Sequence, residues 1–228
     1  MPRVRKHERP LPQQAADDLR TAILQGRLKE GEHLHQVALA RQLGVSPIPL
    51  REALRQLEAE GFVTLEPYHG AVVRAMTPEE LHDLTETRLA LEALALRSAL
   101  PHLTPELVDQ AIHVRDGMVA ATDPREVHEA HLVLLDILYA SAERPHLLHL
   151  LREVVSRAQR YYPVYKQVLG TLPDGLPTLL AYLQACRRKD LAEANRLLET
   201  RLRATTEACG AWLRQRAQAS APDAEGRP

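Results

Sequence analysis

Residues 39–54 read LARQLGVSPIPLREAL. Apolar residues recur at helical spacing before Gly44 and again after Pro47, and glycine is common just past a helix end. Ser46 is a favoured N-cap residue, and proline suits the first helical position because the N–H has no partner there. The stretch therefore predicts two short helices joined by a tight turn.

The flanking sequence extends this pair into a small unit. Helices are predicted over residues 11–25, about 35–43 and about 47–60, and FVTL, a turn at residues 67–70 and AVV predict a two-stranded hairpin. The positions expected to face its core are Leu11, Ala15, Leu19, Ala22, Ile23, Val37, Leu39, Ala40, Leu43, Leu50, Ala53, Leu54 and Leu57. Three short helices with a hairpin are the layout of a winged helix-turn-helix, whose third helix enters the DNA major groove.

The composition favours a mostly helical protein. Of 228 residues, 45% are apolar, 4% are aromatic and only 10 are glycine, whereas sandwiches and barrels use many glycine turns and aromatic strands. The formal net charge of -1 argues against a uniformly basic nucleic-acid coat. No apolar run approaches about 20 residues, so we expect no membrane span, no signal peptide and a cytoplasmic location. Cys186 and Cys209 are too few for a disulfide framework or a zinc cage, and we expect two unreactive thiols.

From Thr77 onward the pattern is helical almost to the end. TPEE at residues 77–80 is a capping box with proline at the first helical position, and it predicts a helix to about Ala99. Further helices are predicted from Thr104, from Asp123, over about residues 144–165, from Pro177 and from Asp190 to about Gln215. Helices joined by short connections favour a bundle.

The fold class is therefore mainly α, in two domains. We expect a winged helix-turn-helix with a small two-stranded wing over residues 1–76, an all-helical bundle over residues 77–218 and a disordered tail over residues 219–228. Residues 1–76 hold 11 Lys and Arg against 9 Asp and Glu, and the remainder holds 18 against 21. Positive charge is thus modestly enriched in the N-terminal domain.

Several motifs of the N-terminal domain occur together and in order. They are LRTAILQGRL at residues 19–28, LARQLGVS at 39–46, REAL at 51–54 and HGA at 69–71. Over about residues 10–76 the chain resembles the GntR family of bacterial transcription regulators, and residues 84–96 are similar to the opening of that family's FadR-type ligand-binding domain, the FCD class. The resemblance implies a homodimer that binds palindromic operator DNA and a small-molecule effector.

Contacts with DNA are expected from polar, cationic and exposed residues of the N-terminal domain. The candidates are Arg20, Arg41, Ser46, Ile48, Arg51, Arg55, His69 and Gly70, together with Arg3, Arg5, Lys6 and Arg9 on the leading arm. Arg51 is expected to contact a base or a phosphate, because arginine suits bidentate contact with guanine. For His69 and Gly70, DNA contact and a plain turn are both open.

One motif departs from the family pattern. Members usually carry Ser/Thr-Arg-Thr-Pro before the REAL run, and the first Arg of that motif reaches a base, whereas this chain has Ser46-Pro47-Ile48-Pro49. Pro47 has no side-chain donor. Either the operator differs from the common half-site, with Ile48 against a thymine methyl, or sequence discrimination is weaker.

The resemblance also implies a metal site, which this chain does not match. FCD domains typically hold a divalent metal with one Asp and three His, and the four positions carry His131, Leu135, Leu179 and Arg201 here. Leucine has no donor atom and arginine is cationic, so we expect no metal and no cofactor. His128 with His131, and His146 with His149, have the spacing of helical ligand pairs, but chance pairs are expected among 11 histidines.

The effector is expected to be an anion such as a carboxylate. In this hypothesis an apolar pocket is lined by the residues at the four metal positions, and Arg88 and Arg201 pair with the ligand. The alternative is that Arg88 forms a structural salt bridge with Glu92.

Two other functions differ in class from a regulator. One is an enzyme housed in the bundle, but the sequence has no nucleophile elbow, phosphate loop or HExxH motif. The other is an interaction module that has lost DNA binding, which Pro47 makes conceivable.

Overall fold

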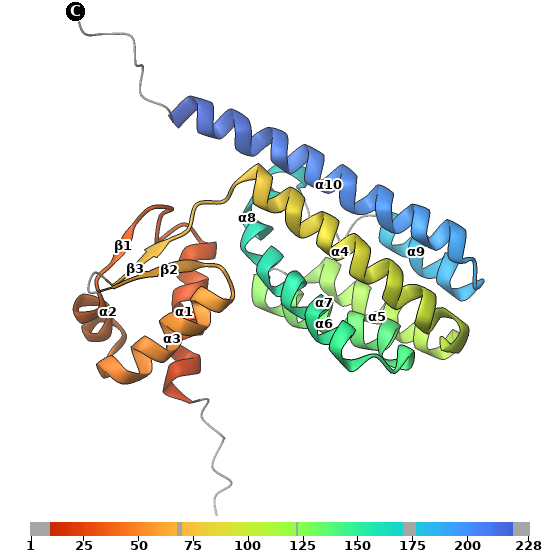
Figure 1. Ribbon diagram of the computed structural model, residues 1–228, viewed down its shortest axis with the longest axis horizontal. Coiled ribbons are helices and arrows are strands. Elements are labelled where there is room, and N and C mark those ends of the chain that lie inside the picture. Colours follow the sequence, from red (N-terminus) through yellow and green to blue (C-terminus); the bar gives the residue numbers. More distant parts are fainter. Residues whose placement is uncertain (1–9, 68–69, 122, 171–176, 221–228) are drawn as a thin grey trace, which may run out of the picture. The chain divides into compact units, whose positions relative to one another are not determined.

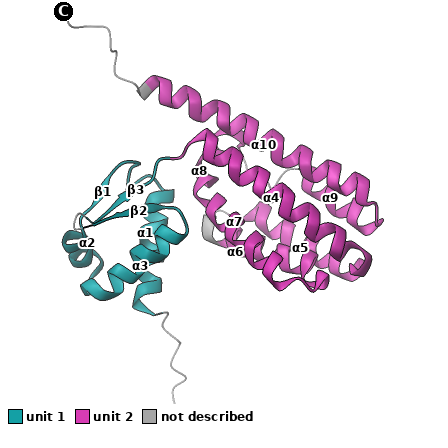
Figure 2. Ribbon diagram, in the orientation of Figure 1, with its two compact units in different colours: residues 1–75 teal, residues 76–228 magenta. Residues whose placement is uncertain are grey.

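The computed structural model describes residues 10–67, 70–121, 123–170 and 177–220 (Figure 1). The chain divides into two compact units, Met1–Ala75 and Met76–Pro228, each with its own hydrophobic core (Figure 2). The division expected from the sequence lies one residue later, after Met76. Among the described residues, no helix is both long and apolar enough to cross a membrane.

Unit 1 contains the three predicted helices: α1 (Leu11–Leu24), α2 (Gln36–Leu43) and α3 (Pro47–Ala59). Gly44 ends α2 with φ 65°, a left-handed conformation that glycine adopts without a steric penalty. Two expected core positions are wrong: Leu11 is 56% exposed and Val37 is 74% exposed. Each lies in the first turn of its helix, before the residues that reach the core.

The sheet of unit 1 has three strands, so the predicted two-stranded wing is incomplete. The strands are β1 (His33–Leu34), β2 (Val63–Glu66) and β3 (Gly70–Val73), in the order β1-β3-β2 and antiparallel. Sequence periodicity missed β1 because two residues are too few to show alternation.

All the regular secondary structure in the described part of unit 2 is helical. Its α-helices are α4 (Pro78–Ala99), α5 (Pro105–Ala120), α6 (Pro124–Tyr139), α7 (Pro145–Ala158), α8 (Tyr162–Leu169), α9 (Pro177–Arg187) and α10 (Leu191–Ser220). Three single 3₁₀ turns accompany them: η1 (Leu100–His102), η2 (Ala140–Ala142) and η3 (Gln159–Tyr161). Helix α10 runs alongside α4 (Figure 1). The mainly α fold class is confirmed.

Two boundaries in unit 2 differ from the predictions. The helix expected over about residues 144–165 is divided into α7, η3 and α8. Pro163 is the physical reason, because it has no N–H to continue the helical hydrogen bonds. Helix α10 continues to Ser220, so residues 219 and 220 are helical and not part of a tail. Residues 221–228 of the expected tail lie outside the described residues.

The start of α4 is fixed by the predicted cap. Thr77 Oγ1 accepts a hydrogen bond of 3.1 Å from the backbone N–H of Glu80, and Pro78 occupies the first helical position. Helix α4 therefore begins at a defined residue, Pro78, two residues after the first residue of unit 2.

The two cysteines of the chain lie in unit 2. Cys186 and Cys209 are buried free thiols, and burial raises the pKa of the Cys186 thiol to about 12.

Candidate functional site

Helix α3 presents a mixed polar and apolar surface to solvent. Its apolar stripe is buried and consists of Leu50, Ala53, Leu54 and Leu57. This burial leaves Arg51 and Arg55 exposed, together with Ile48, whose exposed fraction is 70%. A large aliphatic side chain on a solvent-facing helix suits contact with an apolar group such as a thymine methyl.

The N-terminus of α3 has few backbone donors. Pro47 and Pro49 have no N–H, so Ile48 supplies the one amide among the first three helical positions. Ser46 has the extended backbone of an N-cap residue, but its side chain makes no capping hydrogen bond. Contact with DNA at this end would therefore rest on side chains.

A hydrogen bond from α3 to α2 orients Arg51. Arg51 Nε donates to Gln36 Oε1 at 3.2 Å, and both partners are accessible to solvent. Arg41 is exposed in the last turn of α2. Gln36 carries no signal for this role in the sequence, because its pairing with Arg51, 15 residues away, depends on how α2 packs against α3.

Arg20 does not belong to this surface, and its expected contact with DNA does not fit the structure. Its exposed fraction is 7%, and its guanidinium donates to Asp17 Oδ1 at 2.6 Å and to both carboxylate oxygens of Glu60 at 2.8 Å. The guanidinium also lies 6.0 Å from the centre of the Phe62 ring. Arg20 therefore ties α1 to the end of α3.

Gly70 has a structural reason to be glycine. Its φ is +97°, and a Cβ atom at this position would lie 2.5 Å from the carbonyl oxygen of Leu34 on β1. Close approach of β1 therefore excludes a side chain. His69 lies outside the described residues, as do the leading-arm candidates Arg3, Arg5, Lys6 and Arg9.

Unit 2 encloses a cavity of about 30 Å³, with space for one or two water-sized groups. Its lining comes from α4, α6, α7, α8 and α10: Leu81, Leu84, Thr85, Arg88, His131, Val155, Ala158, Tyr162, Tyr165, Leu202, Thr205 and Thr206. Thr85 and Thr206 also line a surface groove between α4 and α10. The threonine pair therefore lies between this groove and the interior cavity.

Arg88 belongs to a buried hydrogen-bonded chain that runs from His131 through Glu92 to Tyr182. Its Nε donates to Glu92 Oε2 at 2.8 Å, and Tyr139 donates to Glu92 Oε1 at 2.9 Å. Because the proton of Tyr139 goes to Glu92, Tyr182 is the donor in its 2.7 Å bond to Tyr139. Burial disfavours the charged form of Glu92, but Arg88 and Arg201 outweigh that effect and hold the pKa of Glu92 below its ordinary value. The predicted Arg88–Glu92 salt bridge is confirmed.

His131 is an acceptor in this chain. Arg88 NH2 lies 2.9 Å from His131 Nε2, and arginine has no acceptor atom, so Nε2 accepts and the ring proton is assigned to Nδ1. His131 is 3% exposed and Arg88 is 9% exposed. The site thus places an imidazole acceptor beside a buried cation.

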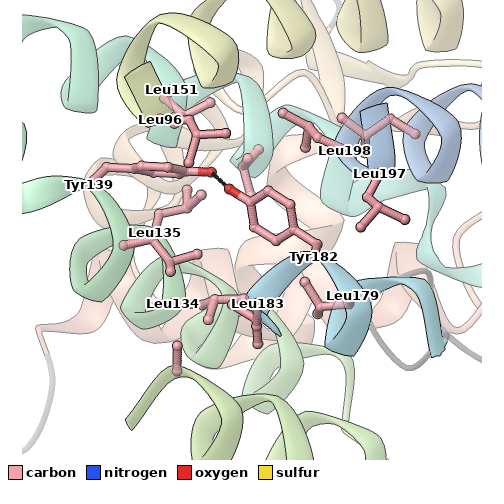
Figure 3. Packing of buried hydrophobic residues seen from close by; sticks show 14 of the residues in the cluster. Leu96, Leu134, Leu135, Tyr139, Leu151, Leu179, Tyr182, Leu183, Leu197 and Leu198 are labelled. Carbon is pink, nitrogen blue, oxygen red and sulfur yellow. Dashed lines mark hydrogen bonds between the residues drawn. The ribbon is translucent and has the colours of Figure 1, made fainter. Parts of the chain in front are cut away.

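The four positions of the family metal site do not form a donor set. Leu135 and Leu179 are 1% exposed and pack in the aliphatic core with the two tyrosines (Figure 3), and neither lines the cavity. The charge of Arg201 helps to lower the pKa of Glu92, and His131 Nε2 accepts from Arg88. In the part of the chain that the structure describes, no group of three His, Cys, Asp or Glu has the geometry of a metal site. These residues do not fit a metal.

The two histidine pairs have other partners. His128 Nε2 lies 3.4 Å from Ser156 Oγ, and His149 Nε2 lies 3.4 Å from Glu153 Oε1. His146 is exposed. Spacing along a helix did not predict these contacts.

Both units match known families. Residues 11–73 match the family described as "Bacterial regulatory proteins, gntR family", and residues 83–204 match the FCD domain. The chain belongs to the GntR family. Members are transcription regulators and not enzymes, so the hypothesis of an enzyme in the bundle is excluded. The chain carries a GntR-type helix-turn-helix domain and an FCD domain, as the motifs predicted.

Relatives and solved structures agree with this GntR assignment. The Nta operon transcriptional regulator of Aminobacter aminovorans is 38% identical over 109 residues, which are 47% of this chain and 50% of that protein. The HTH-type transcriptional regulator YdhC of Bacillus subtilis (strain 168) is 26% identical over 155 residues, 65% of this chain and 69% of that protein. The match thus spans only half the length of the Nta regulator.

Two solved structures show the same fold. A GntR family member from Pseudomonas syringae pv. tomato str. DC3000 has a TM-score of 0.56 at 27% identity, over 92% of this chain and 89% of that one. A GntR regulator from Rhodococcus sp. RHA1 has a TM-score of 0.68 at 23% identity, over 87% of this chain and 96% of that one.

Proposed function

We propose that the protein acts in the cytoplasm as a homodimer that binds a palindromic operator, and that a small carboxylate bound in unit 2 changes its affinity for DNA. The observation that carries the DNA-binding part is the face of α3, where Arg51 and Ile48 are exposed opposite a fully buried stripe. A dimer places two such helices about one DNA turn apart, roughly 34–36 Å, on a palindromic site.

The proposed DNA contacts come from α2, α3 and the wing. They are Arg41, Ser46, Ile48, Arg51, Arg55, His69 and Gly70, and Arg20 is removed from the set. Exposed arginines supply phosphate and base contacts, and Ile48 supplies an apolar contact. The weak overall charge of the chain makes sequence-independent binding weak, so discrimination depends on these few groups.

The proposed effector site is the cavity of unit 2. Arg88 and His131 line it, whereas Arg201, which was expected to pair with the ligand, is not among the lining residues and acts on Glu92 through its charge. A buried guanidinium in contact with a cavity suits a carboxylate ligand. Leu135 and Leu179 support the walls of the bundle and are not proposed to contact the ligand.

Selection of binding sites from random duplex DNA with the purified full chain tests the DNA-binding part. The proposal expects an enriched inverted repeat with salt-sensitive affinity, and a sedimentation equilibrium mass of two chains. Enrichment of a single half-site by a monomer would contradict the dimer, and no enrichment at low salt would contradict operator binding.

A further inference from the structure

We infer that Arg51 reads a guanine in each operator half-site through its two terminal nitrogens, and that Gln36 is the positioning residue that holds Arg51 for this contact. The inference deepens the proposed function and rests on it for the entry of α3 into the major groove. Three observations on the described residues carry it: the place of Arg51 along α3, the direction of its hydrogen bond to α2, and the contrast with neighbouring arginines.

Arg51 is the first side chain within α3 that can donate a hydrogen bond. Residues 47–50 at the start of the helix read PIPL, and none of these side chains has a donor. In a helix-turn-helix, the N-terminal residues of the recognition helix contact the base edges. Arg55 lies four residues further along, which is about one helical turn. Of the two arginines, Arg51 is therefore the one nearer to the bases.

The hydrogen bond to Gln36 uses the inner nitrogen of the guanidinium. Arg51 Nε donates to Gln36 Oε1 at 3.2 Å, and the amide oxygen must face Arg51 because arginine has no acceptor atom. The two terminal nitrogens of Arg51 keep their N–H groups, which have no partner among the described residues. Two of these N–H groups are parallel and match the O6 and N7 acceptors of guanine. The geometry thus leaves the guanine-reading edge of Arg51 available.

The same hydrogen bond distinguishes Arg51 from its neighbours. Arg41 on α2 and Arg55 on α3 are also exposed, but within the described residues their side chains form no hydrogen bond or ion pair. A bidentate contact with a base needs a defined plane of the guanidinium, and holding that plane before binding lowers the entropy lost on binding. A phosphate contact tolerates a more mobile side chain and carries no sequence information. Arg51 is therefore assigned to a base, and Arg41 and Arg55 to phosphates.

The neutral amide of Gln36 orients Arg51 without neutralising it. A carboxylate at this position would accept the same hydrogen bond, but it would cancel the charge of the guanidinium and repel the phosphates of DNA. Among the described residues, no Asp or Glu forms an ion pair with Arg51. Glutamate and leucine in place of Gln36 therefore separate the loss of charge from the loss of orientation.

Parallel selection of sites from random duplex DNA, with the full chain and its variants, identifies the base that Arg51 reads. We expect the wild type to enrich one guanine in each half-site that Arg51→Ala no longer enriches. Gln36→Leu should reduce the enrichment of that guanine and of no other base. Gln42→Leu is the matched control and should select the wild-type site, because Gln42 is exposed on the same helix and forms no side-chain hydrogen bond with the described residues.

Replacing that guanine by 7-deazaguanine removes the N7 acceptor, and anisotropy of the labelled operator then measures the contact itself. The wild type and Gln42→Leu should lose about 5–10-fold in affinity, whereas Arg51→Ala and Gln36→Leu should lose less than about twofold. Gln36→Glu should restore the sensitivity, because its carboxylate also accepts from Nε. It should also reduce the salt slope of binding by about 1, whereas Gln36→Leu changes no charge and should keep the wild-type slope.

Wild-type sensitivity to 7-deazaguanine in Gln36→Leu would overturn the inference, as would loss of that sensitivity in Gln36→Glu. So would an enriched site without a guanine that depends on Arg51, or a guanine that is lost in Arg55→Ala instead. Urea midpoints equal to that of the wild type show that the variants fold, and the Gln36→Glu result does not depend on the leucine variant. If no site is enriched at low salt, operator binding itself is contradicted, and the two failures are thereby distinguished.

Discussion

The hydroxyl of Tyr161 lies 3.0 Å from the carbonyl oxygen of Thr77 and 3.1 Å from Glu80 Oε2, and it donates its proton to them. Arg160 NH1 is 3.2 Å from the same carboxylate oxygen of Glu80. The turn η3 is thereby held against the first turn of α4, directly after the segment that leads from unit 1. Ala158 and Tyr162, which flank η3, line the cavity. A ligand bound in this cavity, as proposed, would contact the segment that holds the start of α4.

Tyr161→Phe should separate ligand binding from its effect on DNA. The variant loses the hydroxyl that donates to Thr77 and Glu80 and should lower the free energy of unfolding by about 1 kcal/mol, measured by urea denaturation. A small carboxylate such as propionate should still bind, but its effect on DNA affinity, measured by anisotropy, should shrink. An unchanged effect on DNA would show that this contact does not couple the two sites.

Glu92→Gln should strongly destabilise unit 2, by about 3 kcal/mol, because Arg88 and Arg201 lose a buried counter-ion. Since the folded-state pKa of Glu92 is below its ordinary value, its contribution is present above the unfolded pKa and is lost as pH falls through the folded one. Wild-type stability should therefore decline below about pH 5 more steeply than that of the variant. Parallel pH slopes would contradict the role given to Glu92.

Arg51→Ala and Arg20→Gln should have opposite consequences. Arg51→Ala removes an exposed side chain and should weaken DNA binding by about 10–100-fold with little change in stability. Arg20→Gln removes the buried cation that pairs with Asp17 and Glu60 and should lower the free energy of unfolding by about 2 kcal/mol. Once folded, it should retain the salt dependence of DNA binding. Loss of a phosphate contact in Arg20→Gln, seen as a salt slope reduced by about 1, would return Arg20 to the DNA surface.

Ile48 should make the operator sensitive to thymine methyl groups. Replacing thymine by deoxyuridine at successive positions of the selected operator removes one methyl at a time, and one replacement should weaken wild-type binding by about 1 kcal/mol or more. Ile48→Ala should bind the thymine and deoxyuridine operators alike. If no position distinguishes the two bases, the alternative of weaker sequence discrimination is favoured.

Local chemistry predicted most of the fold. The Gly44 helix end, the Thr77 cap and the run of helices in unit 2 all follow from residues close in sequence, and the structure confirms them. Strand β1 was missed because its two residues gain their structure only by pairing with β3. Pro163 was overlooked as the residue that divides the helix of residues 144–165.

The candidate site was less predictable because its contacts join distant segments. Arg88 with Glu92 is an i,i+4 pair that the sequence shows directly, whereas Tyr139 lies 47 residues from Glu92. Arg20 matched a cationic motif, but its side chain points to Glu60, 40 residues away. The sequence shows which residues carry charge, whereas packing decides which of them lie at the surface.

The most direct test of the account is the anisotropy of the selected operator titrated with the full chain, with and without a small carboxylate such as propionate and in the presence of EDTA. Ala158→Leu fills the cavity from its lining, and Arg203→Gln is the control because Arg203 lies at the surface groove and not at the cavity. The account predicts that the carboxylate shifts the operator affinity of the wild type and of Arg203→Gln by about 5–150-fold, and leaves that of Ala158→Leu unchanged. Equal shifts in the wild type and Ala158→Leu, or an affinity that no small carboxylate changes, would contradict it.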